Sequence, residues 1–287
     1  MPNNRIFYGC TAVEVTAPGG SSTPVHGAQS VGLTTNQTLE QAFQLGRVSL
    51  YDNTVVDGQI EITLSKVLDK RASIWTLATG GGAIIDNVDD RVTIKIGVGP
   101  DTASAVSSGV GVLCTGFYVS SLNYTFPVDG AFTEEVTFIG DSITAGTAIS
   151  APTGTKASVG RRGTFSQTGG PSGTILSASI SADFGREAIY GLASTTPVHR
   201  YANFPFEVTT EFEVLATDVP VTAIAYGTPC TTSSSGVALS ITACGYIFNM
   251  GSGNVLESVA YNGGDTGGGN ATVTFTYKTY NDLSISG

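Results

Sequence analysis

The residue best placed by type and context for covalent chemistry is Ser142, which follows Asp141 in the run FIGDSITAG (Phe138–Gly146). A serine hydroxyl acts as a nucleophile when a base accepts its proton and nearby donors stabilise the oxyanion that forms. The chain contains only two histidines, His26 and His199, so few residues could supply that base. Serine-based hydrolysis is therefore the covalent chemistry to weigh first.

The run FIGDSITAG resembles the first block of the GDSL-type (SGNH) serine hydrolases, and this resemblance implies Ser142 as the nucleophile. The same family carries a DxxH block and a GxND block. Here the residues three positions before the histidines are Thr23 and Thr196, and the one Asn-Asp pair is Asn281–Asp282, at the end of the sequence. We therefore expect no enzyme and interpret Val136–Gly140 as a strand and Asp141–Gly146 as its exit turn, with the hydrolase as a less favoured alternative.

We predict no cofactor and no metal ion. The run Gly80–Gly82 lacks the strand–GxGxxG–helix context of a dinucleotide site, and no GK[ST] signature of a P-loop is present. The run DNVDDR (Asp86–Arg91) lacks the glycine and the distal glutamate of an EF-hand loop. The cysteines show no CxxC spacing, so we interpret them as thiols of a protein made in a reducing cytoplasm: Cys10, Cys114, Cys230 and Cys244.

The composition excludes several classes of protein. The chain has 287 residues, a net charge of −10, 13% charged and 41% hydrophobic residues, and 37 glycines, which is typical of a β-rich protein with a packed core. An acidic chain does not wrap DNA through phosphate contacts, although DNA can slide past an acidic wall. The sequence has no run near the ~18 apolar residues of a membrane span, and MPNNRIFYG lacks the apolar region of a signal peptide, so we expect no membrane partner.

Alternating patterns predict strands in both halves of the chain. In QIEITL (Gln59–Leu64) the apolar residues occupy every second position, and Phe206–Val214 places apolar residues on one face and three glutamates on the other. Further strands are predicted at Arg91–Ile96, Gly111–Val119, Val136–Ile139, Val221–Tyr226, Val237–Cys244 and Thr272–Tyr277.

A strand–helix–strand pattern occurs twice, in Ala28–Gly46 and in Ile175–Ala193. In the first copy Thr38 and Gln41 have the spacing of a capping box, and Gly46 is a natural helix stop. The pattern predicts one flanking helix in each copy, and a repeat of this length indicates a duplicated supersecondary unit. The residues expected to turn these helices toward the core are Leu39, Phe43, Ile189 and Tyr190.

The prediction for the whole chain is a mainly β protein of two tandem homologous β-sandwich or barrel domains, each with one flanking α-helix. We place the first domain at residues 1–150 and the second at residues 173–287. A Gly/Ser/Thr-rich linker or arm occupies residues 151–172 between them.

Several long runs carry a second resemblance: SVGLTTNQTLEQAFQLGRVSLYDN, IEITLSKVLDKRASIWTLAT and LNYTFPVDGAFTEEVTFIGD in the first half, and SISADFGREAIYGLASTTPVHRYANFPFEVTTEFEVLATD in the second. These runs resemble tail tube proteins of tailed bacteriophages, in a duplicated, two-domain form. The resemblance implies a structural virion protein whose rings stack into a tube that conducts DNA during ejection. Because the domain is doubled, three chains would give six quasi-equivalent positions, so we expect trimeric rings.

The same resemblance implies the partners and the location of the protein. It would bind further copies of itself within and between rings, and other tail proteins such as the sheath, terminator or baseplate. DNA would pass through the lumen without specific binding, and the protein would lie in the virion tail after assembly in the host cytoplasm. The acidic strand faces are candidates for the lumen lining, through Glu61, Glu207, Glu211 and Glu213.

Other functions fit the same composition. Another virion ring or decoration protein, such as a tail terminator, a baseplate component or a capsid cement protein, would also be β-rich and acidic. A secreted adhesin or carbohydrate-binding sandwich is less favoured, because no signal peptide is recognised and aromatic residues are sparse.

Overall fold

The protein is mainly β in its computed structural model, which confirms that part of the predicted fold class. The structure describes residues 11–99, 110–146, 149, 151–153, 158–192, 194, 196–216, 236–263 and 269–287. The predicted strand Val221–Tyr226 lies outside these ranges. Within them, the helices are all too short to cross a bilayer.

The large sheet contains twelve strands. They are β1 (Thr11–Thr16), β2 (Thr23–Pro24), β3 (Ala28–Ala42), β4 (Asp52–Val67), β6 (Val92–Val98), β7 (Val110–Pro127), β8 (Thr133–Gly140), β9 (Ser142–Gly146), β11 (Ile175–Asp183), β14 (Glu207–Leu215), β17 (Val255–Asn262) and β18 (Thr272–Tyr280). The smaller elements are α1 (Ile74–Thr79), β5 (Gly82–Ala83), α2 (Ile84–Asn87), β10 (Phe165–Thr168), β12 (Glu187–Ile189), β13 (His199–Tyr201), β15 (Ser240–Ala243), β16 (Tyr246–Asn249) and β19 (Ser284–Ser286).

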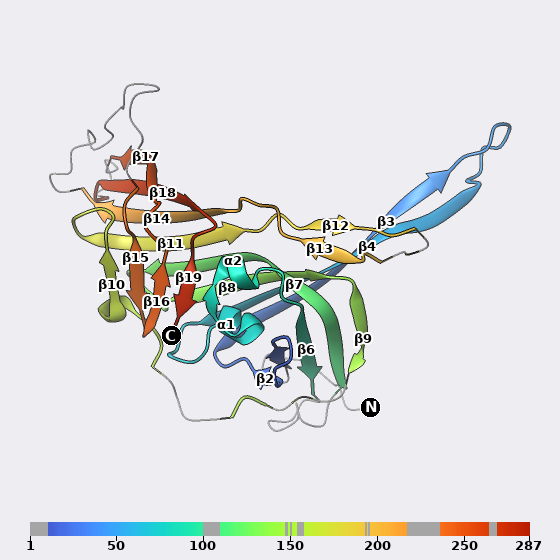
Figure 1. Cartoon of the computed structure of the whole chain (residues 1–287), viewed down its shortest axis with the longest axis horizontal. Coiled ribbons are helices and arrows are strands. Elements are labelled where there is room, and N and C mark those ends of the chain that lie inside the picture. The colour runs from blue at the N-terminus through green and yellow to red at the C-terminus, as the bar shows by residue number, and fades with distance from the viewer. Residues whose placement is uncertain are drawn as a thin grey trace.

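Eight strands of the large sheet form one continuous antiparallel row, in the order β3-β4-β8-β7-β11-β14-β18-β17. The strand β7 is long enough to belong to two rows. Its first part pairs with β6 and β9, and its second part pairs with β8 and β11 (Figure 1). This row of eight strands, named the main row below, joins residues from both halves of the chain.

The alternation read from the sequence decides which face of the main row is buried. Ile60, Ile62 and Leu64 of β4 lie in the core, as do Val208 and Phe212 of β14. Every second residue of a strand faces the same side, so the polar residues between them face the opposite side. The predicted strand faces are confirmed in both halves.

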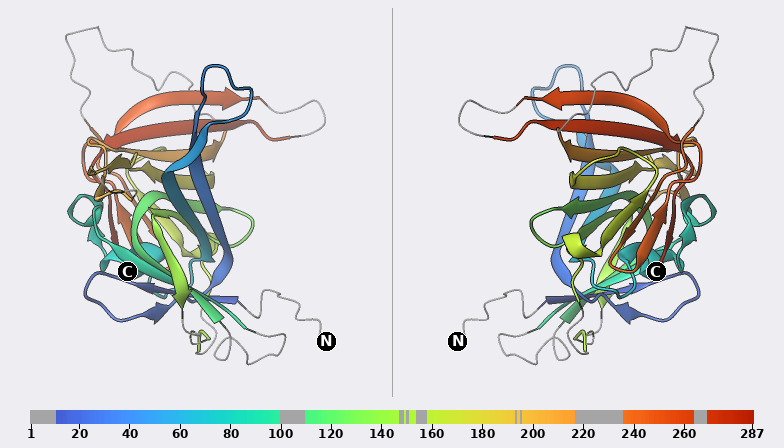
Figure 2. Two further views of the ribbon diagram at one scale, coloured as in Figure 1. Left: turned by 90° about the vertical axis from the view of Figure 1, so that its right-hand side faces the viewer. Right: turned by 90° about the vertical axis from the view of Figure 1, so that its left-hand side faces the viewer.

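A second sheet, β10-β15-β16-β19-β5, packs against the buried face of the main row. Phe248 of β16 lies 4.6 Å from Tyr124 and 5.5 Å from Phe126 of β7, measured between ring centroids. Trp75 of α1 is fully buried in the same core. The views in Figure 2 show the two sheets as layers that cross over one another.

The predicted helix over Thr38–Gly46 is wrong. These residues begin in β3, which pairs with β4 along its length from Ala28 to Ala42. Leu39 and Phe43 are 52% and 73% exposed, so they do not belong to the core. A short helix is marginal without an apolar surface to pack on, whereas a hairpin satisfies the backbone groups of both strands.

The second predicted helix is also wrong. Ile189 lies in β12, which pairs with β13 in a short hairpin, and Tyr190 follows it. Their side chains are 48% and 40% exposed. The α-helices of the described residues, α1 and α2, lie in the first half; α1 is capped by the side chain of Ser73 and ends at Gly80 in the left-handed conformation with φ of 85°.

The described part of the predicted linker, residues 151–172, contains the strand β10. Phe165 of β10 packs against Phe126 and Phe132, with centroids 5.8 Å and 6.2 Å away. One cluster of buried residues includes side chains from both predicted domains. The domain boundaries themselves stay a prediction.

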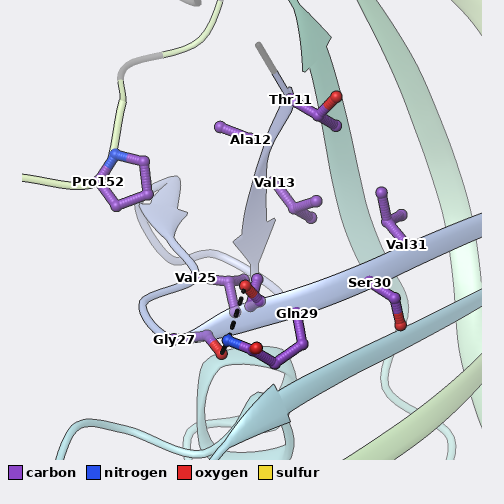
Figure 3. A pocket seen from close by; sticks show the side chains of 10 residues that line it. Thr11, Ala12, Val13, Val25, Gly27, Gln29, Ser30, Val31 and Pro152 are labelled. Carbon is purple, nitrogen blue, oxygen red and sulfur yellow. Dashed lines mark hydrogen bonds between the residues drawn. The ribbon is translucent and has the colours of Figure 1, made fainter. Parts of the chain in front are cut away.

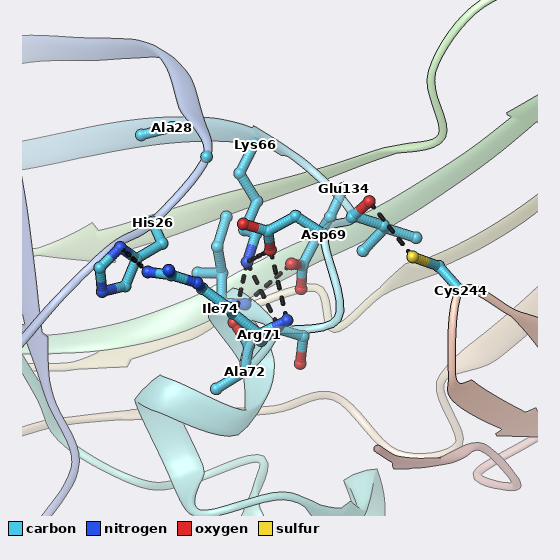
Figure 4. Close-up of polar contacts among 12 residues, drawn as sticks. His26, Ala28, Lys66, Asp69, Arg71, Ala72, Ile74, Glu134 and Cys244 are labelled. Carbon is cyan, nitrogen blue, oxygen red and sulfur yellow. Dashed lines mark hydrogen bonds and ion pairs between the residues drawn. The ribbon is translucent and has the colours of Figure 1, made fainter. Parts of the chain in front are cut away.

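A buried carboxylate fixes α1 to the main row (Figure 4). Glu134 of β8 accepts hydrogen bonds from the backbone N–H of Ile74 at 2.8 Å and of Trp75 at 3.2 Å, and from the hydroxyl of Tyr124 at 2.8 Å. Nearby, the buried Lys66 donates to the carbonyl of Ala72 at 2.9 Å. The carboxylate therefore satisfies helix N–H groups that would otherwise have no partner.

Burial raises the pKa of Glu134 above its ordinary value, although its hydrogen bonds act in the opposite direction. A raised pKa means that the folded protein binds this proton more tightly than the unfolded chain does. The stability from this group is therefore full below the ordinary glutamate pKa and is lost as pH rises through the raised value. We predict that the free energy of unfolding of the wild type falls relative to that of Glu134→Gln as pH rises from 4 to 7, measured by urea titration.

The control is Glu135→Gln, because Glu135 is exposed on the opposite face of the same strand. We expect Glu135→Gln to follow the pH dependence of the wild type. Equal pH slopes for the wild type and Glu134→Gln would contradict the role of this carboxylate.

Candidate assembly surface

The outward face of the main row is polar and acidic. All four glutamates predicted as lumen lining lie on strands of this row, and their pairing positions place them opposite Ser, Thr and other polar residues for the most part. The described residues of this face form shallow grooves, one of about 550 Å³ lined in part by Glu135, Asp183 and Glu207. A second groove is lined by Glu211 and Glu213. The structure thus places the predicted residues on one face, while their role in a lumen stays a prediction.

The glutamates differ in their contacts. Glu207 lies 3.0 Å from the ammonium of Lys278, and Glu257 lies 2.8 Å from the same ammonium. The hydrogen bond to Glu257, followed by that to Glu207, raises the pKa of Lys278. Glu213 accepts a hydrogen bond from Ser177 at 3.1 Å. Glu211 is exposed, so it contributes the least compensated charge of the three on β14.

A long hairpin leaves the body of the molecule and carries apolar side chains into solvent. The distal parts of β3 and β4 with their connection, residues 38–54, are named the first arm, and Figure 1 shows it projecting far beyond the sheets. Leu45 and Val48 at its tip are fully exposed. The other large exposed apolar residues of the first arm are Leu39, Phe43, Leu50 and Tyr51.

The second half has a hairpin of the same design that lies on the chain itself. The β12–β13 hairpin, residues 187–201, is named the second arm. The ladder of the first arm ends at the pair Ala42–Asp52 and that of the second arm at Ile189–His199, so each encloses nine residues, 43–51 and 190–198. The connections of the two arms therefore have the same number of residues.

Buried polar contacts hold the root of the second arm to the first half. Arg186 donates to the carbonyl of Val119 at 2.8 Å and forms an ion pair with Asp89 at 2.7 Å. Its guanidinium lies 5.2 Å from the ring centroid of Tyr118, which adds a cation–π contact. Further out, Arg91 donates to the carbonyl of Val198 at 3.0 Å.

Ser142, Asp141 and His199 line one pocket of about 320 Å³ where the second arm meets the main row. The carboxylate of Asp141 pairs with the guanidinium of Arg200, whose Nε donates to it at 3.1 Å. Nδ1 of His199 lies 2.6 Å from the hydroxyl of Tyr118. The sequence missed this juxtaposition, because β9 and β13 are far apart in the chain and no spacing rule joins them.

The described residues leave the two ends of the main row open. Among the described residues, β3 pairs within the main row with β4 alone and β17 with β18 alone. A cavity of about 620 Å³ lies beside the first residues of β3, lined by Val13, Val25 and Gln29–Val31 (Figure 3). Backbone groups at such edges are free to pair with another strand.

Comparisons of the sequence with protein families and with curated proteins do not indicate a function. No protein-family model matches the chain, and a search of curated proteins found no significantly similar sequence. Within the described ranges, no three His, Cys, Asp or Glu side chains are grouped in a way that could hold a metal ion. Cys114 and Cys244 are buried free thiols, whereas Cys10 and Cys230 lie outside the described residues.

We predict that Asp141→Ala releases the second arm. Arg200 is only 3% exposed, and its buried guanidinium would be left without its carboxylate partner. Breaking a buried ion pair costs about 3–5 kcal/mol, which corresponds to a loss of protection of roughly a hundredfold or more. Hydrogen exchange of the amides in residues 187–201 measures this. Ser142→Ala is the control and should exchange like the wild type; unchanged exchange in Asp141→Ala would refute the anchoring role.

Proposed function

We propose that this chain is a structural protein that polymerises as stacked rings, most simply trimers with pseudo-sixfold symmetry, and forms the tail tube of a tailed bacteriophage. The observation that carries the proposal is the main row, a row of eight strands that is acidic on one face and apolar on the other, and whose edge strands have no further partner within it among the described residues. Its location would be the virion tail, with assembly in the host cytoplasm.

The open edges favour a protein that associates with copies of itself. Soluble monomers usually cover, shorten or charge their sheet edges, since a free edge is a template for another strand. In a cyclic assembly each protomer presents one edge to the next, and the ring closes when the rotations add to a full turn. Closure removes every free edge of the main row at once.

The first arm favours contacts with a neighbouring copy in addition to pairing along the sheet edge. Its exposed apolar side chains form a surface that a lone chain does not cover. In an assembly this arm would reach a neighbouring copy, in the same ring or in the next one. Other tail proteins, such as the sheath, terminator or baseplate, would meet the ends or the outside of the tube.

The acidic face is suited to line a DNA channel. Like charges repel the phosphate backbone, so DNA passes without being held, whereas a basic wall would retain it. Glu61, Glu207, Glu211 and Glu213 would contribute to this wall. DNA is thus a passing cargo in this proposal, not a specifically bound partner.

A serine hydrolase is the second candidate, favoured by the shared pocket of Ser142 and His199. The hydrogen bonds oppose it, because Nδ1 of His199 faces the hydroxyl of Tyr118 and the carboxylate of Asp141 faces Arg200. A catalytic carboxylate would instead orient the histidine. We assign Asp141, Arg200 and His199 to the anchoring of the second arm and propose no enzyme activity.

We predict that Phe43→Ser, Leu45→Ser and Val48→Ser together prevent tube formation. Burying each side chain contributes about 1.5–3 kcal/mol, so their loss weakens association by roughly a thousandfold or more, while the fold of the monomer is unaffected because all three are exposed. Electron microscopy of the concentrated protein checks assembly, and circular dichroism checks folding.

The control for the arm variant is Ile247→Ser, since Ile247 is an apolar residue that is 47% exposed on β16, away from the first arm. This variant should assemble like the wild type. Tubes of normal length from the triple variant would contradict the role of the first arm, and a wild-type protein that stays monomeric at high concentration would contradict the proposed function.

We predict that Glu207→Lys, Glu211→Lys and Glu213→Lys together leave assembly intact but make the tube retain DNA at low salt. The change replaces three negative charges per chain with three positive charges on one face, and phosphate contacts of this kind weaken steeply as salt is added. The matched control replaces the same residues with Gln. Equal DNA retention by the Lys and Gln tubes would show that this face does not line the channel.

A further inference from the structure

The main row consists of two sets of four strands with the same pairing order, β3-β4-β8-β7 and β11-β14-β18-β17. The irregularities of the ladders recur at matched places. The β3–β4 ladder skips one residue between Ala28 and Ser30, and the β11–β14 ladder skips one between Ile175 and Ser177. The two serines therefore mark equivalent positions.

The last ladder of each set shows the same match. The β7–β8 ladder skips one residue between Val119 and Ser121, and the β17–β18 ladder skips one between Leu256 and Ser258. Counting three residues beyond the matched serines makes Tyr261 the counterpart of Tyr124. The same count from Ser30 and Ser177 makes Leu33 the counterpart of Ile180.

The two sets are joined within the chain by the pairing of β7 with β11. In this joint Tyr124 stands opposite Ile180, and both side chains are fully buried. Their counterparts stand on the two open edges. Tyr261 on β17 is 53% exposed and Leu33 on β3 is 41% exposed.

The exposed counterparts, Leu33 and Tyr261, lie on the same face of the main row as Tyr124 and Ile180. Leu33 pairs with the buried Ile62 on β4, and Tyr261 pairs with the buried Val273 on β18, so both side chains lie on the core side of the main row. Thus β17 carries the counterpart of Tyr124 and β3 carries the counterpart of Ile180, the two residues that stand opposite each other in the internal β7–β11 joint.

We propose that β17 of one copy pairs antiparallel with β3 of a second copy of this chain, in the register of the internal β7–β11 joint. Tyr261 then stands opposite Leu33 of the neighbour, and Val259 stands opposite Thr35, as Leu122 stands opposite Ala182 within the chain. This inference rests on the proposed ring and names the contact that closes it. Every joint between four-strand sets in the ring becomes the same kind of joint.

Cysteine cross-linking tests the register. Residues directly opposite each other on antiparallel strands have Cα atoms about 4.5–5.5 Å apart, which a disulfide spans. The chain carrying both Leu33→Cys and Tyr261→Cys, assembled and oxidised, should give covalent closed oligomers on non-reducing gels. The wild-type chain, oxidised alongside, gives the background from its own cysteines.

The matched control carries Leu33→Cys with Ser258→Cys, because Ser258 lies on the opposite face of β17 from Tyr261. It should assemble without cross-linking above the background. Rings in the microscope with no cross-link through Leu33→Cys and Tyr261→Cys would overturn this joint but leave the ring. The absence of rings from the wild-type protein would overturn both.

A second variant guards against an effect of cysteine on folding. Tyr261→Asp places a charge in the proposed joint and should stay monomeric in light scattering, whereas Ile247→Asp, on a strand outside the main row, should assemble. Rings formed by Tyr261→Asp at the concentration at which the wild type assembles would refute the joint.

Discussion

The need of backbone N–H and C=O groups for partners dominates this structure. A row of eight strands satisfies the groups of its inner strands, and among the described residues it leaves the outer groups of β3 and β17 open at its two ends. A row this long, with one apolar face, must also be covered, and the second sheet with α1 covers it. The layered body therefore follows from the main row, and so does the open state of its edges.

The core is asymmetric about the internal joint. In the first half, Glu134 ties the start of α1 to β8, and a buried carboxylate with three donors leaves little freedom in that part of the layer. In the second half, β15 and β16 do the covering, with Phe248 against the rings of β7. The two four-strand sets agree in order and register even though different elements pack on them, so the repeat resides in the row and not in its cover.

Much of the fold could be predicted from the sequence. The predictions failed where local spacing did not determine the surroundings of a residue. Ile60, Ile62 and Leu64 alternate over a few residues, and such a local period predicts the buried face correctly. Leu39, Ala42 and Phe43 have helical spacing, but they lie in the first arm, where the side chains of Leu39 and Phe43 are more than half exposed. The roles of Glu134 and Asp141 depend on Ile74 and Arg200, about sixty residues away, and no spacing in the sequence reports such contacts.

The two arms explain why the run around Ser142 looks catalytic without needing to be. Asp141 follows β8, an inner strand of the main row, and its carboxylate reaches the second arm, where Arg200 supplies the opposite charge. The second arm follows β11, the strand that makes the internal joint, and its anchoring contacts lie within the chain. The first arm is carried by β3, an edge strand, so in the proposed ring a neighbouring copy would supply the contacts that the second arm finds within the chain. Where the copy that pairs with β3 also supplies these contacts, the joint and the arm share one neighbour, and the two linked contacts constrain assembly more than either contact alone.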